Sequence, residues 1–104
     1  MTDKPDKTIP LPEPWYWTEE NLTRQLRKEI SFFHVLFFKK ATTIARREDC
    51  DDVLFQLRHN KYAVVHLTWQ QSSHSSTIWP ETTIYKSWKE VYEKCILIDN
   101  TDSL

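Results

Sequence analysis

The sequence predicts an α+β domain in which an antiparallel meander of three or four strands is flanked by an N-terminal and a C-terminal helix. Three observations lead to this fold class. Short runs of alternating apolar residues fill the middle of the chain, runs with helical spacing lie on either side, and the connections between the central runs are short. Short connections make neighbouring strands antiparallel. We expect both helices to cover one face of the sheet.

One domain is expected, because 104 residues is close to the commonest domain size. Residues 1–14 contain four of the five prolines among scattered charges, which is typical of a flexible N-terminal arm. A single α+β domain should span residues 15–98, and residues 99–104 should form a polar tail. The run Trp15-Tyr16-Trp17 provides apolar surface that docks the end of the arm.

A first helix is predicted over residues 19–33, with Thr18 as its N-cap. Its apolar face consists of four residues spaced by four, four and three positions: Leu22, Leu26, Ile30 and Phe33. Residues 34–40 are too apolar to assign by periodicity. They fit either the end of this helix or the beginning of a strand.

The predicted strands cover residues 41–47, 52–57, 62–69 and 82–85. Because successive side chains of a strand point to opposite faces, Val53, Phe55 and Leu57 should share one face of the sheet. The next strand provides a matching set: Ala63, Val65, Leu67 and Trp69. Asn60 is expected at positive φ in the hairpin, since the chain has no glycine.

A second helix is predicted over residues 88–97, because apolar residues recur there at helical spacing. These residues are Trp88, Val91, Tyr92, Cys95 and Ile96. Ser87 and Glu90 have the spacing of a capping box at its start.

Composition excludes several classes of protein. Without glycine there is no glycine-rich phosphate loop and no dinucleotide fingerprint. The formal net charge of −1 provides no general attraction for nucleic acid, and no apolar run is long enough to span a membrane. The two cysteines, Cys50 and Cys95, lack zinc-type spacing. We expect a cytoplasmic protein with reduced thiols and with no cofactor or bound metal.

Charged side chains gather around two adjacent predicted strands, and they form a candidate acid–base set: Arg46, Arg47, Asp51, Asp52 and His66. A catalytic interpretation makes the carboxylates and the imidazole the machinery of a small hydrolase or nuclease. A structural interpretation, which we favour, has one arginine holding Asp51 or Asp52 in an ion pair. Acidic neighbours should disfavour the Cys50 thiolate, which argues against a cysteine nucleophile.

A second candidate site lies around the polar loop of residues 70–77. Trp69 and Trp79 flank this loop, and His74 lies within it. Tryptophan is among the residue types that anchor protein interfaces. We therefore expect Trp69, His74 and Trp79 to contact a partner.

The segments ARREDCDDVLFQL, YAVVHLTW and WPETTIY resemble a small uncharacterised bacterial protein family. The resemblance covers about residues 45–85, and it implies a bacterial protein without implying an activity. Members of the family have an acidic or glycine-bearing turn after Leu-Thr-Trp, whereas this chain continues with Gln70-Gln71-Ser72-Ser73. A role for an acidic residue in that loop is therefore not expected here.

Two functions follow from these patterns. The favoured one is a small protein-interaction module, either an immunity-type inhibitor or a regulatory partner, without chemistry of its own. The alternative is a small hydrolase or nuclease-like enzyme that uses the candidate acid–base set. A pocket that converges on His66 would favour the enzyme.

Overall fold

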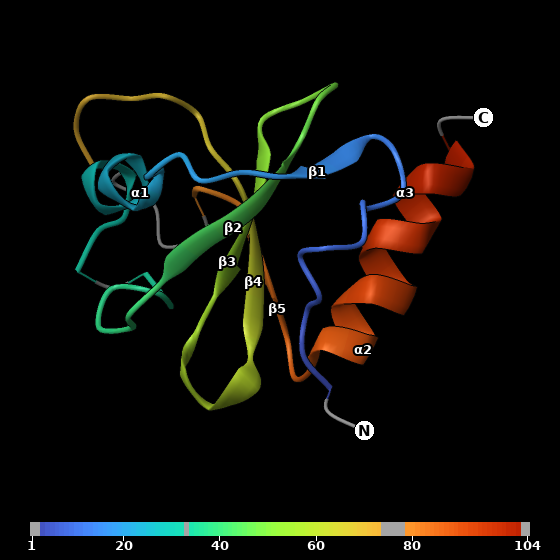
Figure 1. Cartoon of the computed structure of the whole chain (residues 1–104). Coiled ribbons are helices and arrows are strands. Elements are labelled where there is room, and N and C mark those ends of the chain that lie inside the picture. Colours follow the sequence, from blue (N-terminus) through green and yellow to red (C-terminus); the bar gives the residue numbers. More distant parts are fainter. Residues whose placement is uncertain (1–2, 33, 74–78, 103–104) are drawn as a thin grey trace.

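The computed structural model describes residues 3–32, 34–73 and 79–102. Within these ranges, five strands form one antiparallel sheet in the order β1-β2-β3-β4-β5 (Figure 1). The strands are β1 (Trp15–Trp17), β2 (Thr42–Arg47), β3 (Asp52–Gln56), β4 (Tyr62–His66) and β5 (Thr82–Tyr85). Each strand pairs with the next along the chain, which confirms the predicted meander and the α+β class.

The prediction of three or four strands missed β1. Trp15 pairs with Arg47 and Trp17 pairs with Ala45, so β1 is an edge strand beside β2. Three residues are too few to show the alternation that identifies a strand. The sequence therefore indicated only an apolar docking segment at this position.

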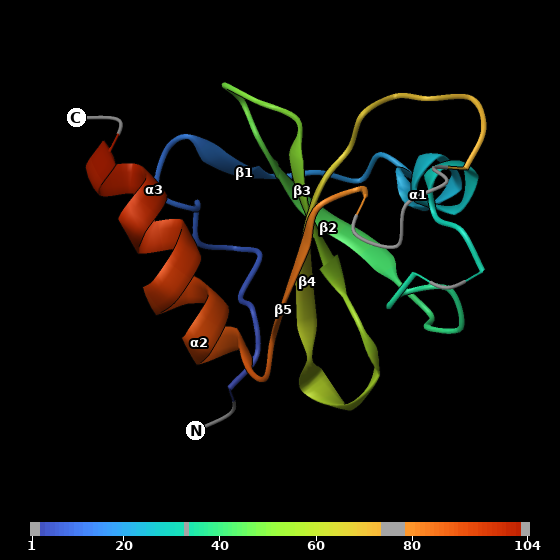
Figure 2. The same ribbon diagram turned by 180° about the vertical axis from the view of Figure 1, so that it is seen from behind.

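The helices lie on opposite faces of the sheet, so the expectation that they share one face is wrong (Figures 1 and 2). Helix α1 (Thr23–Glu29) covers one face. The C-terminal helix covers the other, and it runs as α2 (Trp88–Val91), a π-helical segment (Tyr92–Ile96) and α3 (Leu97–Asp102). Both faces of the central strands carry apolar side chains, and each face therefore needs its own cover.

Two separate cores result from this arrangement. The α1-side core contains Leu22, Leu26, Ile30, Leu36, Ala41, Val53, Phe55, Leu57, Ala63, Val65 and Leu67. The opposite core contains Leu11, Trp15, Ile44, Ala45, Leu54, Tyr62, Val91 and Ile96, with Tyr92 and Cys95 packed at its edge. The predicted alternation along β3 and β4 is therefore confirmed. A bulge in β2 lets the consecutive residues Ile44 and Ala45 enter the same core.

Helix α1 is shorter than the predicted range of residues 19–33 at both ends. Thr18 does not cap it, because its hydroxyl accepts the Glu20 N–H within a local turn. The first turn is instead satisfied from β2, where the Thr43 hydroxyl accepts the Leu22 N–H at 3.1 Å. Ile30 is already extended, and residues 34–40 form turns that are neither helix nor strand. Phe33 lies outside the described residues.

The N-terminal segment, expected to be a flexible arm, lies between the C-terminal helix and the sheet (Figure 2). The Asp3 carboxylate accepts the backbone N–H groups of Trp88 and Lys89, and Leu11 is buried. Asn100, in the expected polar tail, donates to the Glu13 carbonyl at 2.7 Å. Ser87 caps the C-terminal helix as predicted, because its hydroxyl accepts the Glu90 N–H.

Strand β4 ends at His66, three residues earlier than predicted. Trp69 has a φ of 64°, which ends any extended run, and its side chain is exposed and does not enter the core. Asn60 has a φ of 57°, which confirms the predicted hairpin conformation. In the described ranges, no helix is long and apolar enough to cross a membrane.

Candidate functional site

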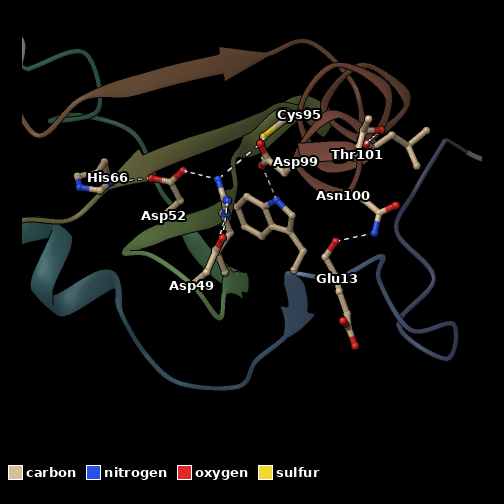
Figure 3. Close-up of polar contacts among 11 residues, drawn as sticks. Glu13, Asp49, Asp52, His66, Cys95, Asp99, Asn100 and Thr101 are labelled. Carbon is tan, nitrogen blue, oxygen red and sulfur yellow. Dashed lines mark hydrogen bonds and ion pairs between the residues drawn. The ribbon is translucent and has the colours of Figure 1, made fainter. Parts of the chain in front are cut away.

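Three members of the candidate acid–base set lie together on the face of the sheet that the C-terminal helix covers. His66 lies opposite Asp52 in the register of β3 and β4, and its Nδ1 is 2.7 Å from Asp52 Oδ1 (Figure 3). Arg47 Nη1 is 3.7 Å from Asp52 Oδ2. The predicted pairing of an arginine with Asp52 is therefore confirmed for Arg47.

Two further carboxylates complete this group, which we call the Arg47 cluster: Arg47, Asp49, Asp52, His66 and Asp99. Asp49 accepts two guanidinium hydrogen bonds, at 2.9 and 2.8 Å. Asp99 comes from α3, and its Oδ1 is 3.5 Å from Arg47 Nη1. Sequence reasoning missed Asp99 because residue 99 was assigned to the polar tail. A signal existed, since Asp99 lies one turn beyond Cys95 if the helix continues.

Within the Arg47 cluster, Arg47 and Asp49 stabilise each other in their charged forms. The hydrogen bonds to Asp49, and then the charge of Asp99, raise the pKa of Arg47 above its ordinary value. Arg47 in turn lowers the pKa of Asp49 by hydrogen bonding. Asp99 also accepts the Trp15 indole N–H at 2.7 Å (Figure 3). The cluster therefore joins β1, β2, β3, β4 and α3 at one corner of the molecule.

The other two members of the predicted set lie outside this cluster. Arg46 Nη1 pairs with Glu20 Oε1 at 3.2 Å, ahead of α1. Asp51 contributes its backbone carbonyl, which accepts the Leu67 N–H. The sequence predicted that all five residues lie near one turn. However, the side chains of Arg46 and Arg47 point to opposite faces of the sheet, because successive residues of a strand alternate.

Neither thiol is arranged as a nucleophile. Burial, with the nearby carboxylates of Asp52 and Asp49, raises the pKa of Cys50. Burial and the Asp99 charge raise the pKa of Cys95 to about 12. Among the described residues, no three His, Cys, Asp or Glu side chains converge to hold a metal ion. The chemistry available to the cluster is proton transfer by the His66–Asp52 pair.

A buried carboxylate that the sequence did not indicate fixes the start of the loop after β4. Glu29 is fully buried and accepts hydrogen bonds from the Thr68 N–H, the Thr68 hydroxyl and the Trp69 N–H, at 2.7–2.9 Å. Gln25 Nε2 bridges Glu29 and the Gln70 carbonyl, at 2.8 Å from each. These contacts hold the loop against α1 and hold Trp69 in its left-handed conformation.

Exposed apolar side chains gather on the α1 side of the sheet. We call five of them the α1-side surface: Phe32, Val35, Phe38, Trp69 and Trp79, which are 40–81% exposed. They come from three parts of the chain: residues 32–38, Trp69 and Trp79. Buried His34 Nε2 lies 3.1 Å from the Pro80 carbonyl, and Glu29 accepts the Trp69 N–H, so both tryptophans adjoin the chain at the end of α1. The predicted contact residues Trp69 and Trp79 are thus at the surface, and His74 lies outside the described residues.

Comparisons with models of protein families, with curated proteins and with solved structures find no match for this chain. The resemblance of residues 45–85 to a small bacterial family stays a prediction.

Proposed function

We propose that this protein is a small bacterial, cytoplasmic protein-interaction module, an immunity-type inhibitor or regulatory partner, and that it binds its partner through the α1-side surface. The observation that carries the proposal is the exposure of five large apolar side chains on three segments that adjoin at the end of α1. Contiguous exposed apolar surface on a soluble protein is typical of an interaction site. Two of the five are tryptophans, the residue type most enriched among binding hot spots.

The anchoring of the loop supports the same proposal. The Trp69 side chain is exposed, and the Trp69 backbone N–H donates to the buried Glu29 carboxylate at 2.9 Å. A loop whose backbone is held in place before binding loses less conformational entropy when a partner arrives. The α1-side surface is therefore suited to recognition by preformed shape.

Partner capture from the native host tests the proposal. Trp79→Ala and Trp69→Ala should each reduce recovery of the partner at least tenfold, which is the usual cost of losing a hot-spot residue. Tyr16→Ala is the matched control, because Tyr16 is as exposed as Trp79, at 40% each, but lies on edge strand β1. The melting temperature of all three variants should stay close to that of the wild type. Undiminished capture by both Trp variants would refute the proposal.

One observation favours the alternative, a small hydrolase or nuclease-like enzyme. His66 Nδ1 is 2.7 Å from Asp52, and the His66 side chain is 46% exposed, so its second ring nitrogen can face a substrate. A carboxylate that orients a histidine in this way is typical of a general base. Turnover of a phosphodiester or ester by the purified protein, lost in His66→Ala without a change in melting temperature, would establish the enzyme.

A further inference from the structure

A cavity of about 340 Å³ opens between the segment after residue 37 and the hairpin that joins β3 to β4. Its apolar lining comes from Phe38, Leu57 and Ile84. Leu57 is buried in the α1-side core, whereas Phe38 is 81% exposed. The cavity is at the small end of the range for ligand pockets, and it suits one or two side chains of a binding partner.

The charges around this cavity are all of one sign. Four cationic side chains line it: Lys39, Lys40, Arg58 and Lys61. His59 is also part of the lining, which includes no acidic residue. Within the part of the chain that the structure describes, none of the four cations forms an ion pair, whereas Arg46, Arg47 and Lys94 do. A hollow lined by like charges concentrates a positive potential, even on a chain whose net charge is −1.

The backbone on both sides of the cavity is held in place. Arg27 donates hydrogen bonds to the carbonyls of Leu36, Phe37 and Lys39, which fixes the segment that carries Phe38. On the hairpin side, the Leu57 N–H donates to the Lys61 carbonyl at 2.8 Å. The four cations therefore project from a preformed frame, and binding does not have to order the backbone first.

We propose that this cavity binds an acidic segment of the protein partner. An apolar side chain of that segment lies against Phe38, Leu57 and Ile84, while flanking Asp or Glu carboxylates pair with the cations at the rim. An apolar centre with a charged rim is the usual anatomy of a protein interface. This assignment rests on the proposed function, because Phe38 belongs both to the cavity and to the α1-side surface.

The alternative polyanion, single-stranded nucleic acid, fits the cavity less well. Proteins that bind single strands use an extended cationic groove with several stacking aromatics. Here the cations surround one compact hollow, and among the described residues Phe38 is the only aromatic one in its lining apart from the His59 ring. Carboxylates next to an apolar side chain match both the size and the chemistry of this hollow.

The test begins with selection of a random twelve-residue peptide library on the immobilised full-length protein. Enriched peptides should combine Asp or Glu with aliphatic or aromatic residues. Fluorescence anisotropy then measures one labelled enriched peptide and its homologue in which Gln and Asn replace Glu and Asp. The acidic peptide should bind at least tenfold more tightly than the amide homologue, and 500 mM NaCl should weaken its binding.

Matched double variants locate the site. Lys40→Ser with Lys61→Ser should weaken peptide binding about tenfold, because it removes two of the four rim cations. Lys7→Ser with Lys94→Ser makes the same change of charge on the N-terminal segment and the C-terminal helix, which lie on the opposite face of the sheet, and should have no effect. All four lysines are exposed, so both variants should keep the melting temperature of the wild type. Equal weakening by the two variants, or peptides without acidic enrichment, would overturn the assignment.

A twelve-nucleotide oligo-dT tests the competing class of ligand, single-stranded nucleic acid. It should not displace the peptide, and displacement that depends on Lys40 and Lys61 would make the cavity a nucleic-acid site.

Partner capture separates the two proposals. If Trp79→Ala abolishes capture while the Lys40–Lys61 variant retains both the partner and the peptide, the α1-side surface stands and the acidic-segment assignment fails. If only the Lys40–Lys61 variant loses its ligands, the cavity stands and the α1-side surface fails.

Discussion

Glu29 is a buried acid at the end of α1, and hydrogen bonds keep it charged. Burial by itself raises the pKa of this carboxyl. The donors on Thr68, Gln25 and Trp69 outweigh burial, and the pKa lies below its ordinary value of 4.5. A carboxylate that accepts several N–H and O–H groups is favoured in its ionised form. The residue thereby connects α1 to the chain that follows β4.

Acidification should release this connection. Because the folded-state pKa of Glu29 is below 4.5, its contribution to stability is complete above that pH and is lost as the pH falls through the folded-state value. Glu29→Gln should lower the free energy of unfolding by about 1.5–3 kcal/mol at pH 7, the usual value of hydrogen bonds to a charged group. Urea unfolding at pH 7 and pH 3.5 checks this. The gap between variant and wild type should be smaller at pH 3.5, and a constant gap would contradict the assignment.

The sequence could not reveal the contacts of buried Glu29 or of half-buried Asp99, because a polar residue beside an apolar stripe normally faces solvent. Glu29 precedes Ile30 at the end of α1, and its contacts include residues far along the chain, Thr68 and Trp69. Cys95 was correctly expected to pack on the apolar face of its helix. The contact between Cys95 and Asp99 could not be predicted, because it requires the helix to extend beyond residue 97.

Both thiols should react slowly with alkylating reagents, since the thiolate is the reactive form. Cys95 should be the slower, because burial and the Asp99 charge raise its pKa to about 12, whereas Cys50 is less perturbed. Iodoacetamide labelling at pH 8, followed by peptide mass mapping, measures both rates against free cysteine. Labelling of Cys95 at the rate of free cysteine would show that Asp99 does not face it.

At the scale of elements, the Arg47 cluster is the polar attachment of α3 to the sheet. Arg47 and Asp99 have side chains that are each 18% exposed, so water screens their interaction only partly. Trp15 of β1 donates to the same carboxylate. The contact therefore reaches across the edge of the sheet, and it joins strands near the N-terminus to the last helix.

A double-mutant cycle with Arg47→Met and Asp99→Asn should give a coupling energy of about 1–2 kcal/mol in urea unfolding. Arg46→Met with Glu20→Gln is the matched control, because Glu20 is 54% exposed. That pair should give no more than about 0.5 kcal/mol, as exposed pairs do. Equal coupling in the two cycles would mean that the Arg47 cluster is an ordinary surface ion pair.

Elements with their own repeating pattern were predicted well, and elements defined by tertiary contacts were not. Alternation places Val53 and Val65 on the face where they lie, and short turns set the order of β2, β3 and β4. In contrast, α1 ends at Glu29 because the backbone becomes extended at Ile30, where the chain enters the segment that Arg27 holds. Strand β1 exists because β2 offers it an edge.

At the scale of the whole molecule, one sheet separates two cores, and neighbouring residues of β3 belong to different cores. Phe55 packs under α1, and Leu54 packs under the C-terminal helix. Both are fully buried. A single sheet forms a wall of each core. Loss of either core therefore removes the packing from one face of the strands that the other core also needs. We therefore expect the two halves to unfold together.

Phe55→Ala should lower the free energy of unfolding by about 3–5 kcal/mol, and Leu54→Ala by about 2–5 kcal/mol, as buried large-to-small substitutions do. Thr83→Ala, at an exposed position of β5, is the control and should change it by less than about 0.5 kcal/mol. Urea unfolding followed by circular dichroism and by tryptophan fluorescence should give one coincident transition for every variant, with an unchanged dependence on urea. A loss below about 1 kcal/mol for Phe55→Ala would contradict its burial under α1. Two separate transitions in Leu54→Ala would instead show that each core is stable without the other.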